Sequence, residues 1–154
     1  MLSAWRVVKT RHVAQAFDGR GARLHGGRWN SPGNAAVYAS GTQALATLEV
    51  LAGLGSTSIL SAYSLLEVTF DESLVQAVAV ASLPVGWDAR PPGAASQAIG
   101  DKWLMSATSP VLQVPSVIVP AEHNYVLNPD HPDFDRIKIG PPAPFPIDPR
   151  LRHP

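Results

Sequence analysis

The chain has 154 residues, 45% of them hydrophobic and 16% charged, with a formal net charge of zero and no cysteine. This size and composition predict a single folded domain over residues 1–154 and argue against a disordered chain. The neutral charge balance gives no basic footprint for direct nucleic-acid binding, and the lack of cysteine excludes disulfides, thiolate metal sites and a cysteine nucleophile.

The N-terminal residues do not show a basic segment followed by an apolar run, so we expect no signal peptide. No apolar run in the sequence approaches the length that spans a bilayer. We therefore expect a cytoplasmic protein that does not associate with membranes. Fifteen prolines and twelve glycines predict many loops and argue against a bundle of long helices.

The first forty residues predict short strands joined by glycine-rich segments. Residues 4–8 and 36–39 have the apolar character of brief strands. Residues 17–24 are rich in glycine and arginine and are expected to form a loop, and residues 28–30 the end of a strand. The sequence Ser-Pro-Gly-Asn at residues 31–34 predicts a turn.

Residues 41–54 give the clearest helix, which Thr42 can cap and Gly53 and Gly55 can end. The apolar residues expected on its buried face are Leu45, Leu48 and Ala52. Glu49 lies only about 40° from Leu45 around the helix axis. An acid so close to the apolar face is either tucked into a cleft or extends to solvent from the rim, and the helix alone does not decide between the two.

In the rest of the chain, strands predominate. Residues 58–70 predict a strand, residues 83–93 a loop that contains Trp87, and residues 95–107 a second helix. The side chains expected to face inward on that helix are Ile99, Trp103 and Leu104. Further short strands are expected at residues 111–114, 116–119, 124–127, 134–139 and 144–147, followed by a polar surface tail at residues 148–154. Many short strands, two helices and no regular βαβ alternation predict an α+β fold.

Several familiar motifs are missing from the sequence. None of the five histidines are paired at i,i+4 and no His-Glu-x-x-His occurs, so we expect no metal site and interpret His123 and His131 as polar loop residues. No Gly-x-Ser-x-Gly nucleophile elbow is present. There is no Rossmann Gly-x-Gly-x-x-Gly and no P-loop, so a dinucleotide, if one binds, is held without those cradles.

The most informative segment is Gly-Gly-Arg-Trp-Asn-Ser-Pro-Gly at residues 26–33, followed by Tyr38 and Glu49. Paired glycines let the backbone approach a ligand closely, and Arg28 offers a fork of donors suited to a phosphate pair. Cleavage of a nicotinamide–ribose bond passes through an oxocarbenium-like state, which a carboxylate, an aromatic face and an arginine can support. The alternative is a glycine-rich turn with a surface arginine. Taken alone, Ser116 is a strand residue whose hydroxyl bonds the backbone or a ligand.

Several ordered blocks resemble the RES domain family, and together they cover nearly the whole chain. The blocks are residues 26–33, 37–38, 46–51, 100–104, 114–132 and 144–151. The arginine, glutamate and serine that name the family fall on Arg28, Glu49 and Ser116, and its active-site tyrosine falls on Tyr38. The resemblance implies a compact α+β fold similar to ADP-ribosyltransferase toxins, with short, mainly antiparallel sheets and helices around an NAD cleft.

The same resemblance implies a function. RES proteins are toxins of bacterial toxin–antitoxin pairs, partnered by an antitoxin with an Xre-type helix-turn-helix domain in a hetero-oligomer. Members deplete NAD+ by hydrolysis or phosphorolysis, and some ADP-ribosylate a protein. The expected substrate is therefore NAD+, with no metal cofactor, and the acceptor stays open between water, phosphate and a protein side chain. A non-enzymatic partner that tunes antitoxin binding to DNA, or a purely structural domain, are the remaining alternatives.

Residue by residue, the resemblance implies the following roles. Arg28 binds the pyrophosphate or the nicotinamide-side phosphate, and Tyr38 stacks on nicotinamide or its ribose. Glu49 holds the ribose hydroxyls and stabilises the oxocarbenium charge. Ser116 positions the substrate or orients Glu49 through a hydrogen bond. Further candidates for binding the dinucleotide are Arg6, Gly27 and Asn124, with a plain surface arginine as the alternative for Arg6.

Overall fold

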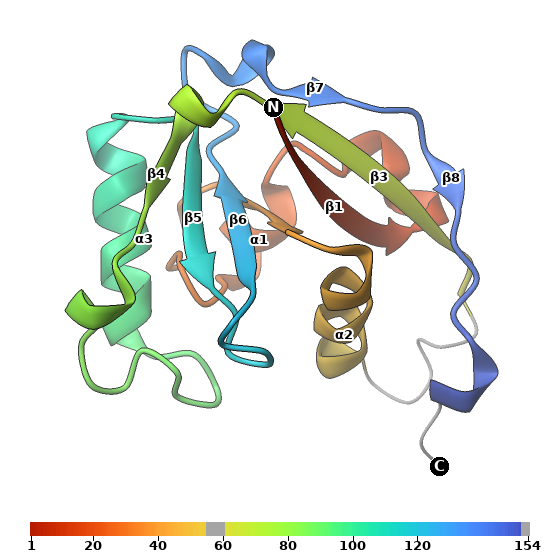
Figure 1. Ribbon diagram of the computed structural model, residues 1–154, viewed down its shortest axis with the longest axis horizontal. Coiled ribbons are helices and arrows are strands. Elements are labelled where there is room, and N and C mark those ends of the chain that lie inside the picture. Colours follow the sequence, from red (N-terminus) through yellow and green to blue (C-terminus); the bar gives the residue numbers. More distant parts are fainter. Residues whose placement is uncertain (55–60, 152–154) are drawn as a thin grey trace.

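The computed structural model describes residues 1–54 and 61–151 and shows a mixed α+β fold around an eight-stranded sheet (Figure 1). The strands are β1 (Leu2–Lys9), β2 (Val37–Ser40), β3 (Tyr63–Phe70), β4 (Val75–Ala77), β5 (Val111–Pro115), β6 (His123–Leu127), β7 (Lys138–Ile139) and β8 (Ala143–Pro144). Their order is β4-β5-β6-β2-β1-β3-β7, with β8 also paired to β3. Neighbouring strands are antiparallel except β4 and β5, which are parallel. The mainly antiparallel α+β architecture is as expected.

Helices pack on this sheet and connect its strands. The α-helices are α1 (Arg20–His25), α2 (Gln43–Gly53) and α3 (Ala94–Ser106), and the 3-10 helices are Thr10–Gln15, Glu72–Leu74, Val80–Ser82, Phe134–Arg136 and Pro149–Leu151. No helix within residues 1–54 and 61–151 combines the length and apolarity that a bilayer span requires.

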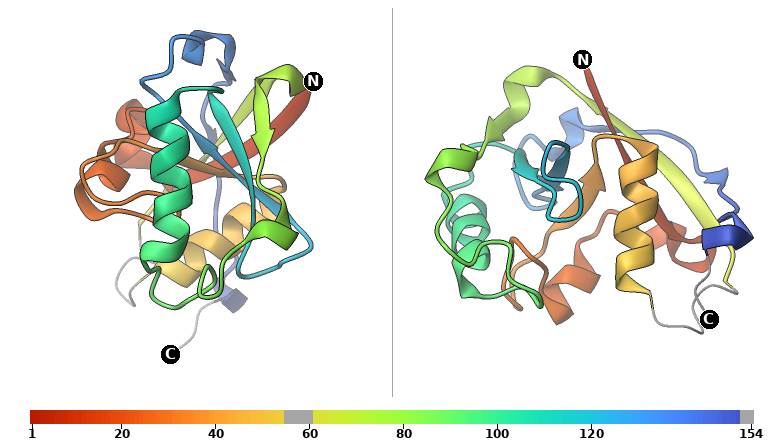
Figure 2. Two further views of the ribbon diagram at one scale, coloured as in Figure 1. Left: turned by 90° about the vertical axis from the view of Figure 1, so that its left-hand side faces the viewer. Right: turned by 60° about the horizontal axis from the view of Figure 1, so that its bottom comes forward.

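The sheet divides into two arms, β4-β5-β6-β2 and β1-β3-β7-β8, and the seam between them is weak. Between β1 and β2 the register joins Trp5 to Ser40 alone, whereas β1 and β3 are paired along eight positions. Figure 1 shows the two arms diverging, and the right view of Figure 2 shows α2 between them. Because so little ladder joins the arms, the sheet opens at this seam, and the candidate site lies there.

The core forms on both faces of the first arm because strand side chains alternate in direction. On one face, Val111, Tyr125 and Leu127 pack with residues of β1 and β3. On the other face, a cluster packs beneath α3, which the left view of Figure 2 shows crossing this arm: Trp29, Ala36, Trp103, Leu112, Val114 and Val126. A third, smaller cluster joins α2 to the second arm through Val7, Ala46 and Tyr63.

Helix α2, the first of the two helices predicted from the sequence, forms as expected, but its buried face is rotated from the predicted one. Thr42 Oγ1 accepts a hydrogen bond from Leu45 N and caps the helix, which ends at Gly53; Gly55 lies outside the described residues. Leu45 and Ala46 are buried, whereas Leu48 is 39% exposed and Ala52 is exposed. The prediction for these last two side chains was wrong, because α2 turns the side that carries Glu49 toward the seam.

Several other predicted elements differ from the structure. Residues 20–25 form α1 where a loop was expected. Residues 28–30, expected to end a strand, lie in a tight turn closed by a bridge between Gly27 and Asn30. Residues 116–119, expected to form a strand, are irregular because the ladder of β5 ends at Pro115. β4 was not predicted. The described part of the 58–70 strand begins at Tyr63. The strands predicted at residues 134–139 and 144–147 are represented only by the two-residue strands β7 and β8.

Three predictions for the second half of the chain are confirmed. Helix α3 forms with Trp103 buried and Ile99 and Leu104 partly buried. Residues 83–93 form the expected loop. Of the tail, residues 149–151 are exposed, and residues 152–154 lie outside the described part of the chain.

Candidate active site

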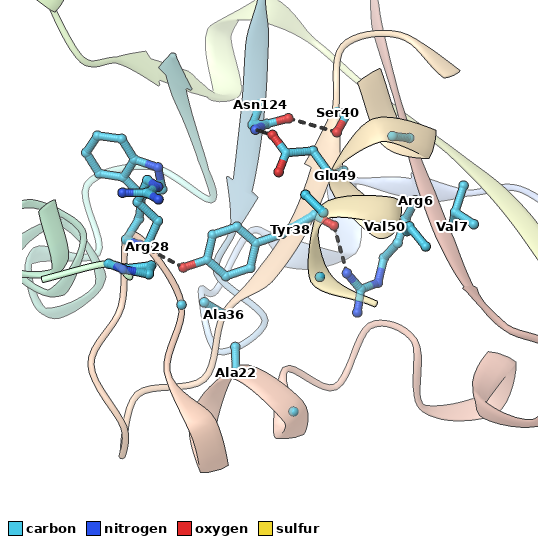
Figure 3. A pocket seen from close by; sticks show the side chains of 18 of the residues that line it. Arg6, Val7, Ala22, Arg28, Ala36, Tyr38, Ser40, Glu49, Val50 and Asn124 are labelled. Carbon is cyan, nitrogen blue, oxygen red and sulfur yellow. Dashed lines mark hydrogen bonds between the residues drawn. The ribbon is translucent and has the colours of Figure 1, made fainter. Parts of the chain in front are cut away.

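A cleft of about 850 Å³ lies at the seam between the two arms (Figure 3). Its walls come from β1, β2, α1, α2 and the start of β6, from the turn at residues 26–29, from the loop at residues 90–92, and from Pro115, Val117 and Ile118 at the end of β5. Six of the seven sequence-predicted site residues line it: Arg6, Gly27, Arg28, Tyr38, Glu49 and Asn124. The seventh, Ser116, is buried directly behind the wall.

The carboxylate of Glu49 is fixed on one side and free on the other. Its Oε1 accepts a hydrogen bond from Asn124 Nδ2 at 2.6 Å and another from Ser116 Oγ at 3.0 Å. Among the described residues, none forms a hydrogen bond with Oε2. Glu49 is half-buried on the cleft side of α2, so the alternative in which it lies in a cleft is the correct one.

The two donors to Glu49 are themselves held in place. Asn124, on β6, accepts a hydrogen bond from Ser40 Oγ at 2.8 Å through its amide oxygen, which leaves the NH₂ group facing Glu49 (Figure 3). Ser116 is 0% exposed, and its oxygen accepts hydrogen bonds from Ile118 N and Val119 N. With both backbone donors on its oxygen, the hydroxyl hydrogen points to Glu49. Ser116 is therefore placed to orient Glu49 and not to touch a ligand.

Tyr38 presents its ring to the cleft while its hydroxyl is occupied. The hydroxyl donates to Asn30 Oδ1 at 2.6 Å and accepts from Trp29 N at 3.0 Å. Burial raises the pKa of Tyr38. A phenol that is buried, satisfied and protonated serves as an aromatic surface and not as an acid or base.

Gly27 is needed for the position of Tyr38. A Cβ at Gly27 would lie 2.7 Å from the Tyr38 hydroxyl and 2.9 Å from Asn30 Oδ1, both closer than real contacts allow. The neighbouring Gly26 has φ +72°, a conformation that favours glycine. The paired glycines therefore let the chain pass under the tyrosine, and close approach to Tyr38 accounts for Gly27 without a ligand.

The turn that carries Arg28 is anchored on α3. Asp101 accepts hydrogen bonds from the backbone and side chain of Ser31 and from Asn34 Nδ2. A Cβ at Gly100 would overlap the carbonyl oxygen of Trp29, so α3 and the turn touch backbone to backbone. This accounts for the Gly-Asp pair in the sequence: both residues fix the turn against the helix.

Arg28 holds a neighbouring loop. Its Nη1 donates to the carbonyl oxygens of Trp87 at 3.0 Å and Ala89 at 2.9 Å, and the ring of Trp87 stacks on Trp29. Burial lowers the pKa of Arg28; Glu49 raises it and Arg90 lowers it further. The glycine-rich turn of the alternative interpretation is present, but its arginine is not a plain surface residue, because Arg28 is half-buried and Nη1 clamps the loop at residues 83–93. Within the described part of the chain, Nε and Nη2 have no hydrogen-bond partner.

Arg6 joins the two arms of the sheet where the ladder fails. Its Nη1 donates to Tyr38 O on β2 at 2.8 Å, and its Nε donates to Ala16 O at 2.8 Å (Figure 3). Burial lowers its pKa to about 10, and Asp18 opposes the shift. For Arg6 too, the surface-arginine alternative is wrong, because the guanidinium forms part of the cleft floor.

Comparison with known proteins assigns the family. The RES domain model matches residues 3–148. The chain belongs to the RES domain family. A "Prs ADP-ribosylating toxin" of Sphingobium sp. (strain YBL2) is 40% identical over 97% of this chain and 96% of the relative, and a "Toxin Res" of Yersinia enterocolitica is 37% identical over 96% and 98%. This RES domain is thus a homologue of toxins.

The fold also matches a solved structure. A chain in the crystal structure of the M. tuberculosis MbcT–MbcA toxin–antitoxin complex superposes with a TM-score of 0.75, covering 94% of this chain and 84% of that one. At 17% identity, the likeness concerns the fold alone.

The RES domain cleft contains charged residues that sequence reasoning missed. Its lining includes four arginines and two carboxylates: Arg6, Arg20, Arg28, Arg90, Asp18 and Glu49. Among the described residues, no carboxylate lies within 4.0 Å of any of these guanidinium groups. The cleft therefore carries excess positive charge although the chain is neutral. No sequence motif marks Arg90, which sits in a proline-rich loop.

Within residues 1–54 and 61–151, no histidine lines the cleft. His131 is buried; its Nδ1 accepts from Asp133 N, and its Nε2 donates to Ala107 O at the end of α3. It is a loop residue as predicted, although a buried one. For His123 the prediction was wrong: it is exposed, but it is the first residue of β6 and pairs with Pro115 of β5. Within the described residues, no group of three His, Cys, Asp or Glu could hold a metal ion.

Proposed function

We propose that this RES domain is the toxin of a bacterial toxin–antitoxin pair and that it cleaves NAD+ at the bond between nicotinamide and ribose. The observation that carries the proposal is the state of Glu49: Oε1 is held by two donors while Oε2 is left for a ligand in a cleft. The toxin names of the relatives support the biological role.

Glu49 suits the transition state of this reaction. As the glycosidic bond breaks, its electron pair leaves with nicotinamide, and positive charge develops on the ribose. A carboxylate beside the ribose stabilises that charge and can accept a ribose hydroxyl. The hydrogen bonds from Ser116 and Asn124 to Oε1 fix the direction of the group before the substrate binds. Such preorganisation avoids reorientation during the reaction.

The remaining lining supplies binding. The ring of Tyr38 is an aromatic surface for nicotinamide or its ribose, and Asn124 lies beside the carboxylate. Arg28, through Nε and Nη2, and Arg6 supply positive charge for the two phosphates. The excess of arginine over carboxylate in the cleft lining favours an anionic ligand over a neutral one.

The test is NAD+ consumption by the purified protein, freed of any partner. We expect loss of NAD+ with release of nicotinamide. In Glu49→Gln, the amide oxygen can still accept both hydrogen bonds but carries no charge, so turnover should fall by about 10³-fold. Glu67→Gln, an exposed glutamate of β3, is the matched control and should keep full activity. A Glu49→Gln protein that consumes NAD+ at the wild-type rate contradicts the proposal.

The acceptor is decided by the products. Water and phosphate can both attack the ribose cation, so the reaction should be run with and without phosphate and the products read by mass spectrometry. A phosphate-dependent product identifies phosphorolysis, and ADP-ribose in both conditions identifies hydrolysis.

A second candidate is ADP-ribosylation of a protein, which uses the same cleft with a different acceptor. The name of the Sphingobium relative, a Prs ADP-ribosylating toxin at 40% identity, favours it. NAD+ labelled in the adenosine moiety separates the two. Label retained on Prs identifies the transferase, and label found only on small molecules identifies NAD+ degradation.

The proposed partner is an antitoxin with an Xre-type helix-turn-helix domain, which blocks the cleft in a cytoplasmic hetero-oligomer. Support comes from the likeness to a chain of a toxin–antitoxin complex. Expression of the domain without antitoxin should arrest growth, and Glu49→Gln should relieve the arrest. Harmless expression of the wild type would instead indicate a non-enzymatic partner.

A further inference from the structure

The loop at residues 83–93 brings a second arginine to the cleft. Arg90 lines the cleft together with Pro91 and Pro92, and its side chain is exposed. Its guanidinium donates from Nη2 to Val117 O at 3.4 Å, near the limit for a hydrogen bond. Among the described residues, no carboxylate forms an ion pair with it. Arg90 is therefore a lightly held cation at the cleft wall.

The position of Arg90 depends on Arg28. Arg28 Nη1 holds the carbonyl oxygens of Trp87 and Ala89, and Ala89 directly precedes Arg90. The stacking of Trp87 on Trp29 also holds this loop. The backbone that carries Arg90 is thus anchored while its side chain is free to meet a ligand.

Arg28 alone offers an incomplete phosphate fork. Both hydrogens of its Nη1 are used by the two loop carbonyls, so the usual pairing of both terminal nitrogens with one phosphate is not available. Arg90 lies close enough to lower the pKa of Arg28. Two like charges on the wall of one cleft, neither paired with a carboxylate in the described structure, are stabilised by an anion that binds both, although Glu49 and the exposed Asp88 offset part of the charge at Arg28.

We propose that Arg90 is a second phosphate-binding residue of the cleft and that, with Arg28, it selects a ligand that carries a diphosphate. The inference rests on the proposed function, since the diphosphate is that of the dinucleotide. Arg28 then has two tasks: it contacts the phosphates through Nε and Nη2, and it positions the loop that delivers Arg90.

The competing explanation is that Arg90 only ties two loops together through Val117 O. Conservative variants separate charge from this tie. Arg90→Lys keeps the charge, whereas Arg90→Gln keeps an N–H donor for Val117 O without charge. Arg23→Ala removes an exposed arginine of α1 that does not line the cleft, and it is the matched control.

The experiment measures the dissociation constant of ADP-ribose by titration calorimetry, with NAD+ turnover of the wild type as a companion. We expect Arg90→Ala and Arg90→Gln to weaken binding by about 10- to 30-fold, Arg90→Lys by about threefold, and Arg23→Ala not at all. Arg90→Ala should raise the dissociation constant by a smaller factor in an Arg28→Ala protein than in the wild type, because the loss of Arg28 has already released the loop.

Each outcome of these binding measurements supports or overturns the role of Arg90. Wild-type binding in Arg90→Gln, or equal losses in Arg90→Gln and Arg90→Lys, overturns the role of the charge. An unchanged dissociation constant in Arg90→Ala, in a protein that turns over NAD+, overturns the Arg90 assignment alone. A wild type that neither turns over NAD+ nor binds ADP-ribose overturns the proposed function and this inference together.

Discussion

Ser116→Ala removes a hydroxyl that makes three hydrogen bonds behind the cleft wall. Its oxygen accepts from Ile118 N and Val119 N at 3.1 and 3.2 Å, and its hydrogen is donated to Glu49 at 3.0 Å. Residues 117–119 are partly or fully exposed, so we expect water to replace the two accepted bonds. We therefore expect a stability loss of about 1 kcal/mol, at the low end for lost hydrogen bonds.

The effect of Ser116→Ala on catalysis should be larger than its effect on stability. A hydrogen bond to a charged carboxylate is worth about 1.5–3 kcal/mol. If this energy holds Glu49 in its reactive orientation, its loss lowers the rate by about 10- to 150-fold, because each 1.36 kcal/mol of barrier is tenfold. Asn124 still holds Oε1, so activity should fall without vanishing. Because Ser116 does not line the cleft, KM should stay within about twofold while kcat falls.

The assay is steady-state NAD+ consumption, with stability followed by urea denaturation. Ser96→Ala is the matched control: Ser96 is buried in α3, and its hydroxyl has no hydrogen-bond partner in the described structure. It should keep full activity and equal or greater stability. A Ser116→Ala protein with wild-type kcat, or with a raised KM at unchanged kcat, refutes the positioning role.

Three further predictions follow from close contacts and burial. Gly27→Ala should displace Tyr38 and lower the free energy of unfolding by about 2–3 kcal/mol, with a large loss of activity. Gly21→Ala, with open space at its Cβ in α1, should be neutral or slightly stabilising in thermal melting. Equal stabilities of the two variants would contradict the predicted clash at Gly27. Gly100→Ala should cost more than about 3 kcal/mol because its Cβ overlaps the Trp29 carbonyl, and soluble protein with a wild-type melting temperature would be inconsistent with that packing. Burial raises the pKa of Tyr38 in the folded state above that of the unfolded chain. The stabilisation by its protonated hydroxyl is therefore fully present below the unfolded pKa and is lost as the pH rises above it. Relative to Tyr38→Phe, the free energy of unfolding of the wild type should fall by up to about 1.4 kcal/mol per pH unit above pH 10. Parallel pH dependences of the two proteins from pH 8 to 11 would count against that burial.

Local features of the sequence determined much of the secondary structure and the residue types of the site. The Thr42 cap and apolar spacing place α2, and the alternation in residues 63–70 places β3 with Ser64, Leu66, Val68 and Phe70 buried. Where local signals were weak, prediction failed. The glycines of residues 17–24 suggested a loop in place of α1, and the β-branched residues after Pro115 suggested a strand where backbone pairing has already ended.

The tertiary structure alone decided how the site residues work. Ser116 and Asn124 meet Glu49 across 67 and 75 residues of chain, and Arg28 reaches its loop carbonyls across about sixty. Hydrogen bonds of this kind join elements through space, and no periodicity or spacing within one segment encodes them. For the same reason, the resemblance named Arg28 but did not reveal that it clamps a loop, and it left Ser116 open between positioning the substrate and orienting Glu49. Arg90, without a motif, became a candidate only when the folded chain brought its loop to the cleft.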